Sequence, residues 1–222
     1  MLKLSQFLNE AAAEKDRHLT HIEDAVLEGG VAGTRNAIEF LIALRDMFAD
    51  DGTTLSEAAG GLILRTKFDG APAIYAGINP ENGRFFVGSK SIFAKNAKLN
   101  YTQADIRANH AGGLADKLSD ALKYLPALGI KGVVHGDFMF SHSDLKSETI
   151  DGHDYITFRP NTITYAVLKN SKVAREVESA KIGIVFHTTY TGNRMDSLTT
   201  NFDIDITSLK KSKNVWFRTN RF

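Results

Sequence analysis

The sequence predicts an α+β fold with a largely antiparallel sheet and flanking helices, and three observations support this prediction. Residues 1–59 repeat apolar positions at helical spacing, whereas short apolar or alternating runs dominate residues 60–222. Helical segments interrupt these runs without a regular strand–helix alternation. Turn residues at 79–83 join two of the runs directly, as in an antiparallel hairpin. We therefore expect an N-terminal helical segment at 1–59 and an α+β domain at 60–222.

Two amphipathic helices are expected in the N-terminal segment. Residues 2–15 place apolar side chains three and four positions apart. Residues 34–49 carry a wider apolar stripe, with Thr34 as the expected N-cap and Gly52 as the expected stop. Each helix would bury one apolar face.

The second domain is expected to alternate irregularly between strands and helices. Residues 141–154 are interpreted as a polar loop, and residues 215–218 as a strand that has just begun. Helical spacing returns at 102–125, around Gly112-Gly113, and a short helix is expected at 171–180. The expected strands are 62–68, 72–78, 84–88, 132–140, 155–158, 162–167 and 182–186.

Composition excludes several classes of function. The 222 residues are 43% hydrophobic and carry a net charge of +1, so nucleic-acid binding would require a local groove rather than a generally basic surface. The absence of cysteine excludes disulfides, thiolate catalysis and Cys-ligated zinc. No apolar stretch approaches the roughly 20 residues that cross a bilayer, and the N-terminus becomes polar too early for a signal peptide. We expect a cytoplasmic protein without a membrane partner, and the sequence leaves its oligomeric state open.

The most informative motif is Lys67-Phe68-Asp69-Gly70, which lies between two apolar runs. A lysine amine is ordinarily protonated and is then a poor nucleophile, so a nucleophilic lysine must be desolvated or placed near other cations. In a strand, Asp69 would alternate to the same face as Lys67, and Gly70 would allow a sharp turn. The simpler alternative is an edge-strand lysine followed by an Asp-Gly turn.

A carboxylate inside an apolar strand is the second informative feature. Asp137 follows Gly136 within the run 132–140, and a buried carboxylate is costly unless it is paired or takes part in chemistry. The alternative is a core aspartate that is capped by nearby backbone or paired with an arginine. Ser89-Lys90, at the end of another expected strand, could place a cation on a phosphate, or Lys90 could be a solvated loop residue.

Together, Lys67-Phe68-Asp69-Gly70, Ser89-Lys90 and the segment around Gly136-Asp137 resemble motifs I, Ia and III of the covalent nucleotidyltransferases. This superfamily contains the ATP-dependent DNA and RNA ligases and the mRNA capping enzymes. The resemblance implies a ligase-like, ATP-grasp-like core in which a lysine attacks the α-phosphate of ATP or GTP and releases pyrophosphate. It also implies ATP and Mg²⁺ as cofactors. A nucleic-acid end would be the acceptor, with RNA slightly favoured over DNA because no separate DNA-encircling module is visible.

The resemblance also implies roles for individual residues. Lys67 would be the catalytic nucleophile, and Asp137 would contact the ribose or a divalent metal. Either Phe158 or Tyr165 would stack on the base. The nucleotide contacts implied in this way are Arg65, Thr66, Asp69, Gly70, Arg84, Lys90, Asp137 and Phe158.

The sequence also departs from the ligase pattern. Ligases often place an arginine shortly after Asp-Gly, where this chain has Ala71-Pro72-Ala73, so Arg84 or Lys90 would have to substitute. Residues 182–186 lack the motif IV acid, and Lys211-Ser212-Lys213 matches the two lysines of motif V only faintly. We therefore expect these two motifs beyond residue 222, in a domain truncated at its C-terminus.

A second resemblance extends over nearly the whole chain. It involves an uncharacterised protein family of large tailed bacteriophages, and it implies a viral protein that acts in the cytoplasm of an infected bacterium. The segments that carry it are 18–24, 69–73, 136–140, 158–162 and 187–192.

Three alternative functions fit parts of the sequence. His135-Gly136-Asp137 resembles the catalytic loop of small-molecule kinases, although His142 stands where those enzymes have a metal-binding asparagine. A non-catalytic phage accessory protein could use the same scaffold. His187 is interpreted as a core or rim histidine rather than a ligand. A metal hydrolase could use oxygen and imidazole ligands from Asp137, His142, Asp144, Glu148, Asp151, His153 and Asp154.

Overall fold

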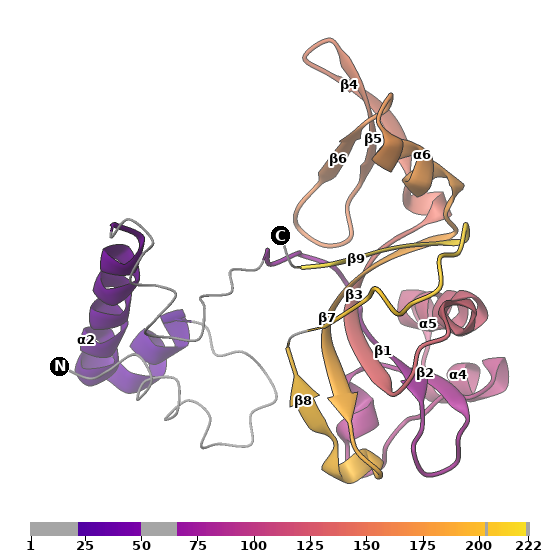
Figure 1. The fold of residues 1–222 in the computed structure, drawn as a ribbon, viewed down its shortest axis with the longest axis horizontal. Coiled ribbons are helices and arrows are strands. Elements are labelled where there is room, and N and C mark those ends of the chain that lie inside the picture. The colour runs from indigo at the N-terminus through magenta and orange to yellow at the C-terminus, as the bar shows by residue number, and fades with distance from the viewer. Residues whose placement is uncertain (1–21, 50–65, 203, 221–222) are drawn as a thin grey trace. The chain divides into compact units, whose positions relative to one another are not determined.

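The computed structural model describes residues 22–49, 66–202 and 204–220 (Figure 1). The chain divides into two compact units, residues 1–64 and 65–222. The expected helix at 2–15, the expected helix stop at Gly52 and the candidate residue Arg65 lie outside the described residues. Within the described ranges, no helix is both long enough and apolar enough to cross a membrane.

The first unit contains helix α2 (Ile22–Ala49), which bends at Gly30. Gly30 has φ 54° and ψ −136°, a conformation that glycine adopts easily because it lacks a Cβ atom. The expectation that Thr34 is the N-cap is wrong, because the helical segment that contains it begins directly after the kink at Gly30. The Thr34 hydroxyl instead donates to the Gly30 carbonyl at 2.8 Å, a bond from residue i to residue i−4 inside the helix.

The second unit is built on a six-stranded sheet with the order β2-β1-β3-β7-β8, in which β9 also pairs with β7. All pairs are antiparallel except the parallel pair β7–β9. This confirms the predicted α+β class and the mostly antiparallel sheet. The strands are β1 (Ala73–Ile78), β2 (Phe85–Gly88), β3 (Val133–Ser141), β7 (Ile182–Thr191), β8 (Thr199–Asn201) and β9 (Val215–Thr219).

Helices α4 (Gln103–Asn109) and α5 (Gly112–Tyr124) cover one face of this sheet (Figure 1). The predicted helical stretch at 102–125 forms these two helices, and the second begins at Gly112, which has φ 59°. Thr102 and Asp105 form a capping box that stabilises the start of α4. The core on this face joins helix side chains to alternate residues of the central strands: Ile106, Leu118, Ile74, Val134, Phe138, Ile184 and Phe186.

The other face of the sheet carries two separate apolar clusters. We call them the Tyr75 cluster, which includes Val133 of β3, and the Phe140 cluster, which includes Met139 of β3. His135 and Asp137 lie on the same face of β3, between Val133 and Met139. The Tyr75 cluster contains Tyr75, Phe86, Ile92, Val133, Tyr190, Met195 and Leu198. The Phe140 cluster contains Met139, Phe140, Ile156, Phe158, Ala174, Val177, Ala180 and Val185.

A smaller antiparallel sheet of three strands follows β3 in the chain and lies beyond its C-terminal end (Figure 1). Its strands are β4 (Lys146–Ile150), β5 (His153–Phe158) and β6 (Tyr165–Leu168), and helix α6 (Lys172–Ser179) follows. The expectation of a polar loop at 141–154 is wrong for β4 and the start of β5. All five residues of β4 are exposed, so the strand shows no apolar alternation. Its turn uses Asp151 and Gly152, both at positive φ, as a tight hairpin requires.

Short 3₁₀ helices complete the described structure. They are η1 (Lys90–Phe93), η2 (Leu125–Leu128), η3 (His142–Asp144) and η4 (Met195–Ser197).

Candidate functional site

The lysine motif lies in an irregular segment that leads into β1. Residues 66–70, here called the lysine loop, have no regular secondary structure, so the expected strand at 62–68 is wrong for its described part. The backbone makes single hydrogen bonds to separate partners instead of a ladder. The Thr66 N–H donates to the Asn220 carbonyl at 2.9 Å, and the Asp69 N–H donates to the Tyr165 hydroxyl oxygen at 2.7 Å.

The carboxylate of Asp69 fixes the lysine loop to the connection between β5 and β6. It accepts hydrogen bonds from Asn161 Nδ2 at 2.9 Å, from the Thr162 hydroxyl at 2.5 Å and from the Thr162 N–H at 2.9 Å. The Ile163 N–H adds a fourth at 3.2 Å. These bonds, the Thr162 hydroxyl first among them, lower the pKa of Asp69 from 3.8 to about 2. Asp69 is therefore a charged residue that shapes the loop.

Aromatic rings hold the other side of the lysine loop. Phe68 stacks on Tyr165 with ring centroids 6.0 Å apart, and Tyr165 stacks on Phe158 at 5.5 Å. Phe158 is buried in the Phe140 cluster and contacts the Phe140 ring. Phe158 thus supports Tyr165, which in turn receives the Asp69 N–H.

Gly70 lets the lysine loop pass directly beside Asp137. A Cβ atom on Gly70 would lie 2.4 Å from the Asp137 Cβ, a distance that real side chains do not reach. The following residues pair with β3: the Ala71 N–H donates to the Phe138 carbonyl at 3.0 Å, and Ala73 is the register partner of Asp137. The structure therefore brings the lysine motif and Asp137 together, while the Lys67 side chain stays exposed.

The two other basic candidates lie at different distances from the lysine loop. Strand β2 ends with Gly88 beside Tyr75, so Lys90 follows at the end of the sheet nearer the loop. Arg84 directly precedes Phe85, which pairs with Ile78 at the far end of β1. Ile78 lies roughly 17 Å along the strand from Ala73, where the lysine loop enters β1. The Arg84 guanidinium lies 4.3 Å from the centroid of the Tyr101 ring. The structure therefore separates Arg84 from the lysine loop.

His187 belongs to the site, although the sequence interpretation placed it in the core or at the rim. Along β7, Thr188 pairs with His135 and Phe186 pairs with Gly136, so β7 contributes one additional residue at this register shift. Such irregularities re-aim side chains. His187 Nε2 lies 3.8 Å from Asp137 Oδ1. A register shift leaves no signal in the sequence, which is why the pattern analysis missed this contact.

His135 completes a group of three side chains on this face. Its ring stacks on Tyr75 with centroids 4.0 Å apart and an interplanar angle of 11°, and it meets the His187 ring edge-on at 4.3 Å. One ligand atom from each of His135, Asp137 and His187 lies within 4.8 Å of the other two. Among the described residues, no other three such side chains come together in this way.

The acidic residues of 141–154 serve local purposes instead. Asp144 accepts the Ser141 N–H at 2.7 Å and forms an ion pair with Lys117. Asp154 accepts the Thr149 hydroxyl at 2.7 Å. The two histidines and the other acids proposed for a metal hydrolase therefore do not converge with Asp137 in the described chain.

Arg218 is a basic residue that the sequence analysis did not select. Val185 of β7 pairs with Asp137 of β3 on one side and with Arg218 of β9 on the other. Arg218 therefore lies on the same face of the sheet as Asp137, in the same cross-strand row and two strands away from it. Its guanidinium donates to Glu176 at 2.6 Å and lies 5.0 Å from the Trp216 ring centroid. Lys211 and Lys213, the faint match to motif V, are exposed and precede β9.

Residues 16–222 match the family model described as a family of unknown function, DUF6267. The chain belongs to this family. Comparisons with curated proteins and with solved structures found no match. In this DUF6267 protein, the chemistry of the site must therefore be argued from the geometry of its own residues.

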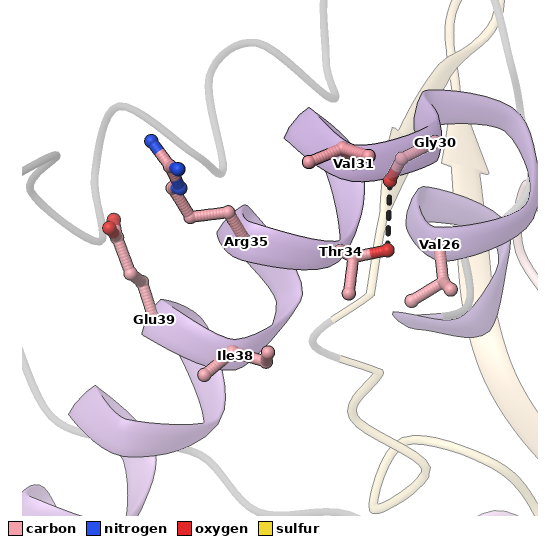
Figure 2. A pocket seen from close by; sticks show the side chains of 7 residues that line it. All are labelled: Val26, Gly30, Val31, Thr34, Arg35, Ile38 and Glu39. Carbon is pink, nitrogen blue, oxygen red and sulfur yellow. Dashed lines mark hydrogen bonds between the residues drawn. The ribbon is translucent and has the colours of Figure 1, made fainter.

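A groove on α2 in the first unit is a separate surface feature of this DUF6267 chain (Figure 2). It lies where the helix bends, and it contains none of the candidate catalytic or binding residues. Its two charged side chains come from Arg35 and Glu39. Because chemistry-bearing side chains gather at the lysine loop and Asp137 instead, we place the candidate site there. The groove is lined by Val26, Gly30, Val31, Thr34, Arg35, Ile38 and Glu39.

Proposed function

We propose that this protein is an ATP-dependent, ligase-like nucleotidyltransferase that forms a covalent lysyl-nucleotide on Lys67. The acceptor would be an RNA or DNA end. One observation carries the proposal: the lysine loop is fixed beside Asp137, with Gly70 packed against the Asp137 side chain. The motif resemblance requires these two segments to meet in one site, so their contact supports it.

The proposed reaction is a substitution at the α-phosphorus of the nucleotide. The lone pair of Lys67 Nζ forms the N–P bond while the bond from that phosphorus to the α,β-bridging oxygen breaks. Pyrophosphate leaves with the electron pair, and the amine proton passes to solvent. Asp69 is not the base, because four hydrogen bonds occupy its carboxylate and its pKa is lowered to about 2. Asp69 instead keeps the loop in position.

Positive charge for the phosphates would come from Arg218 and Lys90. A guanidinium suits a phosphate because its planar donors can form two parallel hydrogen bonds. Arg218 shares a cross-sheet row with Asp137, so it could serve in place of the motif V lysines, which Lys211 and Lys213 match only faintly. Glu176, which now pairs with Arg218, would have to release it for a phosphate.

Mg²⁺ would accompany the nucleotide and be held mainly by the phosphate oxygens. Asp137 itself fits Mg²⁺ poorly, because the ligand atoms nearest to its carboxylate include imidazole nitrogens of His135 and His187. No step of the proposed reaction therefore depends on Mg²⁺ bound to Asp137.

The geometry favours this proposal over the kinase-like alternative. That alternative needs His135-Gly136-Asp137 as a catalytic loop, but these residues form the middle of β3 and pair with β1 and β7 on both sides. The other alternative is a non-catalytic accessory protein with the same fold. Only a measurement of activity distinguishes it from the proposed enzyme.

A labelling assay tests the proposal. The full chain is incubated with ATP or GTP that is radiolabelled at the α-phosphate, in the presence of MgCl₂, and is then denatured and separated by electrophoresis. We expect label on the wild-type chain and only background label on Lys67→Ala. Lys146→Ala, which changes an exposed lysine of β4, should keep the label. Label that persists in Lys67→Ala, or no label with either nucleotide, would contradict the proposal.

A further inference from the structure

We propose that His135, Asp137 and His187 bind a divalent transition-metal ion such as Zn²⁺, Co²⁺ or Mn²⁺. This metal site is separate from the proposed nucleotidyl transfer. All three ligands are side chains of the folded chain, so the ion can bind without a nucleotide. Two of the ligands come from β3 and the third from β7.

The three side chains are close enough to share one ion. Their ligand atoms lie within 4.8 Å of one another, and His187 Nε2 is 3.8 Å from Asp137 Oδ1. Around an ion with bonds of about 2.1 Å, neighbouring ligand atoms lie roughly 3.0–3.4 Å apart, so small side-chain rotations would close the site. The side chains of His187 and Asp137 are 24% and 22% exposed, so an ion can reach them from solvent.

Surrounding residues orient both imidazole rings. His187 Nδ1 lies 2.8 Å from the hydroxyl of buried Thr188, and donation from Nδ1 leaves the Nε2 lone pair available on the side of Asp137. The His135 ring stacks on the buried Tyr75 ring. His187 follows Val185, the register partner of Asp137, by two residues, so strand alternation places its side chain on the face that carries Asp137.

The donor set determines the class of ion. Two imidazoles and one carboxylate suit first-row transition metals, whereas Mg²⁺ prefers oxygen ligands alone. Three protein ligands also leave coordination positions open for water or for an oxygen of a bound molecule. Because Gly70 packs on Asp137, an ion held here would lie beside the lysine loop.

The competing explanation is a simple ion pair between protonated His187 and Asp137, with no metal. An ion pair would not bind metal in a saturable way, and it would not involve His135. Metal binding measured without nucleotide therefore separates the two explanations. It also separates this proposal from the proposed enzymatic function, since either can fail without the other.

The test uses the full chain after treatment with a chelator, titrated with Co²⁺ and followed by visible absorption. We expect saturation at one equivalent, no displacement by a large excess of Mg²⁺, and affinity at least about tenfold weaker in His187→Gln. His153→Gln, in exposed β5 sequence away from the site, is the matched control and should bind as the wild type does. No saturable binding, equal affinity in His187→Gln, or weakening by His153→Gln alone would overturn the proposal.

A measurement on the wild-type chain guards against misfolded variants. Zn²⁺ is added while the imidazole nitrogen resonances of all seven histidines are followed by NMR. We expect the resonances of His135 and His187 to shift together and to saturate with the metal. Shifts confined to other histidines would contradict the site.

Discussion

At the scale of single residues, Asp69 shows how a charged side chain can hold the lysine loop in one conformation. Its carboxylate receives donors from three consecutive residues, 161–163, and its backbone N–H donates to Tyr165. Because its folded-state pKa of about 2 is below the ordinary value of 3.8, the ionised form stabilises the fold. This contribution is complete above the ordinary pKa and is lost as the pH falls from about 4 to about 2.

We expect Asp69→Asn to lower the free energy of unfolding at neutral pH, because an amide cannot accept all the hydrogen bonds that the carboxylate accepts. The difference from wild type should shrink as the pH falls below about 4, where the wild-type carboxylate also loses its charge. Urea unfolding at a series of pH values measures this. Asp151→Asn is the control, since Asn-Gly suits the same hairpin turn. A difference that does not change with pH would contradict the role given to Asp69.

The residues of the site differ in how far the sequence predicts them. The lysine motif and Asp137 each stand out locally, one as Lys-x-Asp-Gly and the other as a carboxylate in an apolar strand. The structure brings these two segments together through Gly70. His187 and Arg218 could not be selected in this way, because their positions depend on strand register between β7 and its neighbours.

At the scale of secondary structure elements, the close contact near the β1–β3 pair depends on glycine. Gly77 has φ 151°, and a Cβ atom there would lie 2.0 Å from the Gly132 carbonyl oxygen. We expect Gly77→Ala to destabilise the fold by about 2–3 kcal/mol, because backbone must move to admit the methyl group. Denaturant unfolding provides the measurement.

Gly113→Ala is the matched control for Gly77→Ala. A Cβ atom at Gly113 in α5 would meet no atom within 4 Å, and alanine favours a helix more than glycine does. This variant should leave stability unchanged or raise it by up to about 1 kcal/mol. If Gly77→Ala and Gly113→Ala lowered the free energy of unfolding equally, the backbone contact at Gly77 would not be tightly packed.

The sequence predicted the helices and strands that bury one or both faces, because burial leaves an apolar pattern in the sequence. Strands β1, β3 and β7 contain apolar runs because both faces of the central sheet are covered, and α4 and α5 follow helical spacing. Strand β4 was missed because all its side chains are exposed, so its pairing with β5 leaves no alternation in the sequence. The helix start expected at Thr34 was misplaced because α2 consists of two helical segments that meet at Gly30, where the backbone is not helical.

At the scale of the whole molecule, the large sheet of the second unit separates packing from the candidate chemistry. One face carries α4, α5 and the main core, whereas the opposite face presents the site between the Tyr75 and Phe140 clusters. The residue that follows β9 also contacts the lysine loop, because the Thr66 N–H donates to the Asn220 carbonyl. Composition and periodicity predicted the fold class, but only the strand order explains how segments distant in sequence assemble one site.

The central claim is that Lys67 forms a covalent bond to a nucleotide, and mass spectrometry of the reacted protein tests it most directly. The full chain is incubated with ATP or GTP and a divalent ion, digested under conditions that preserve phosphoamide bonds, and mapped by peptide fragmentation. We expect one nucleoside monophosphate on the peptide that contains Lys67, with fragment ions that place it on that side chain. An unmodified chain, or an adduct on a different lysine such as Lys90, would contradict the claim.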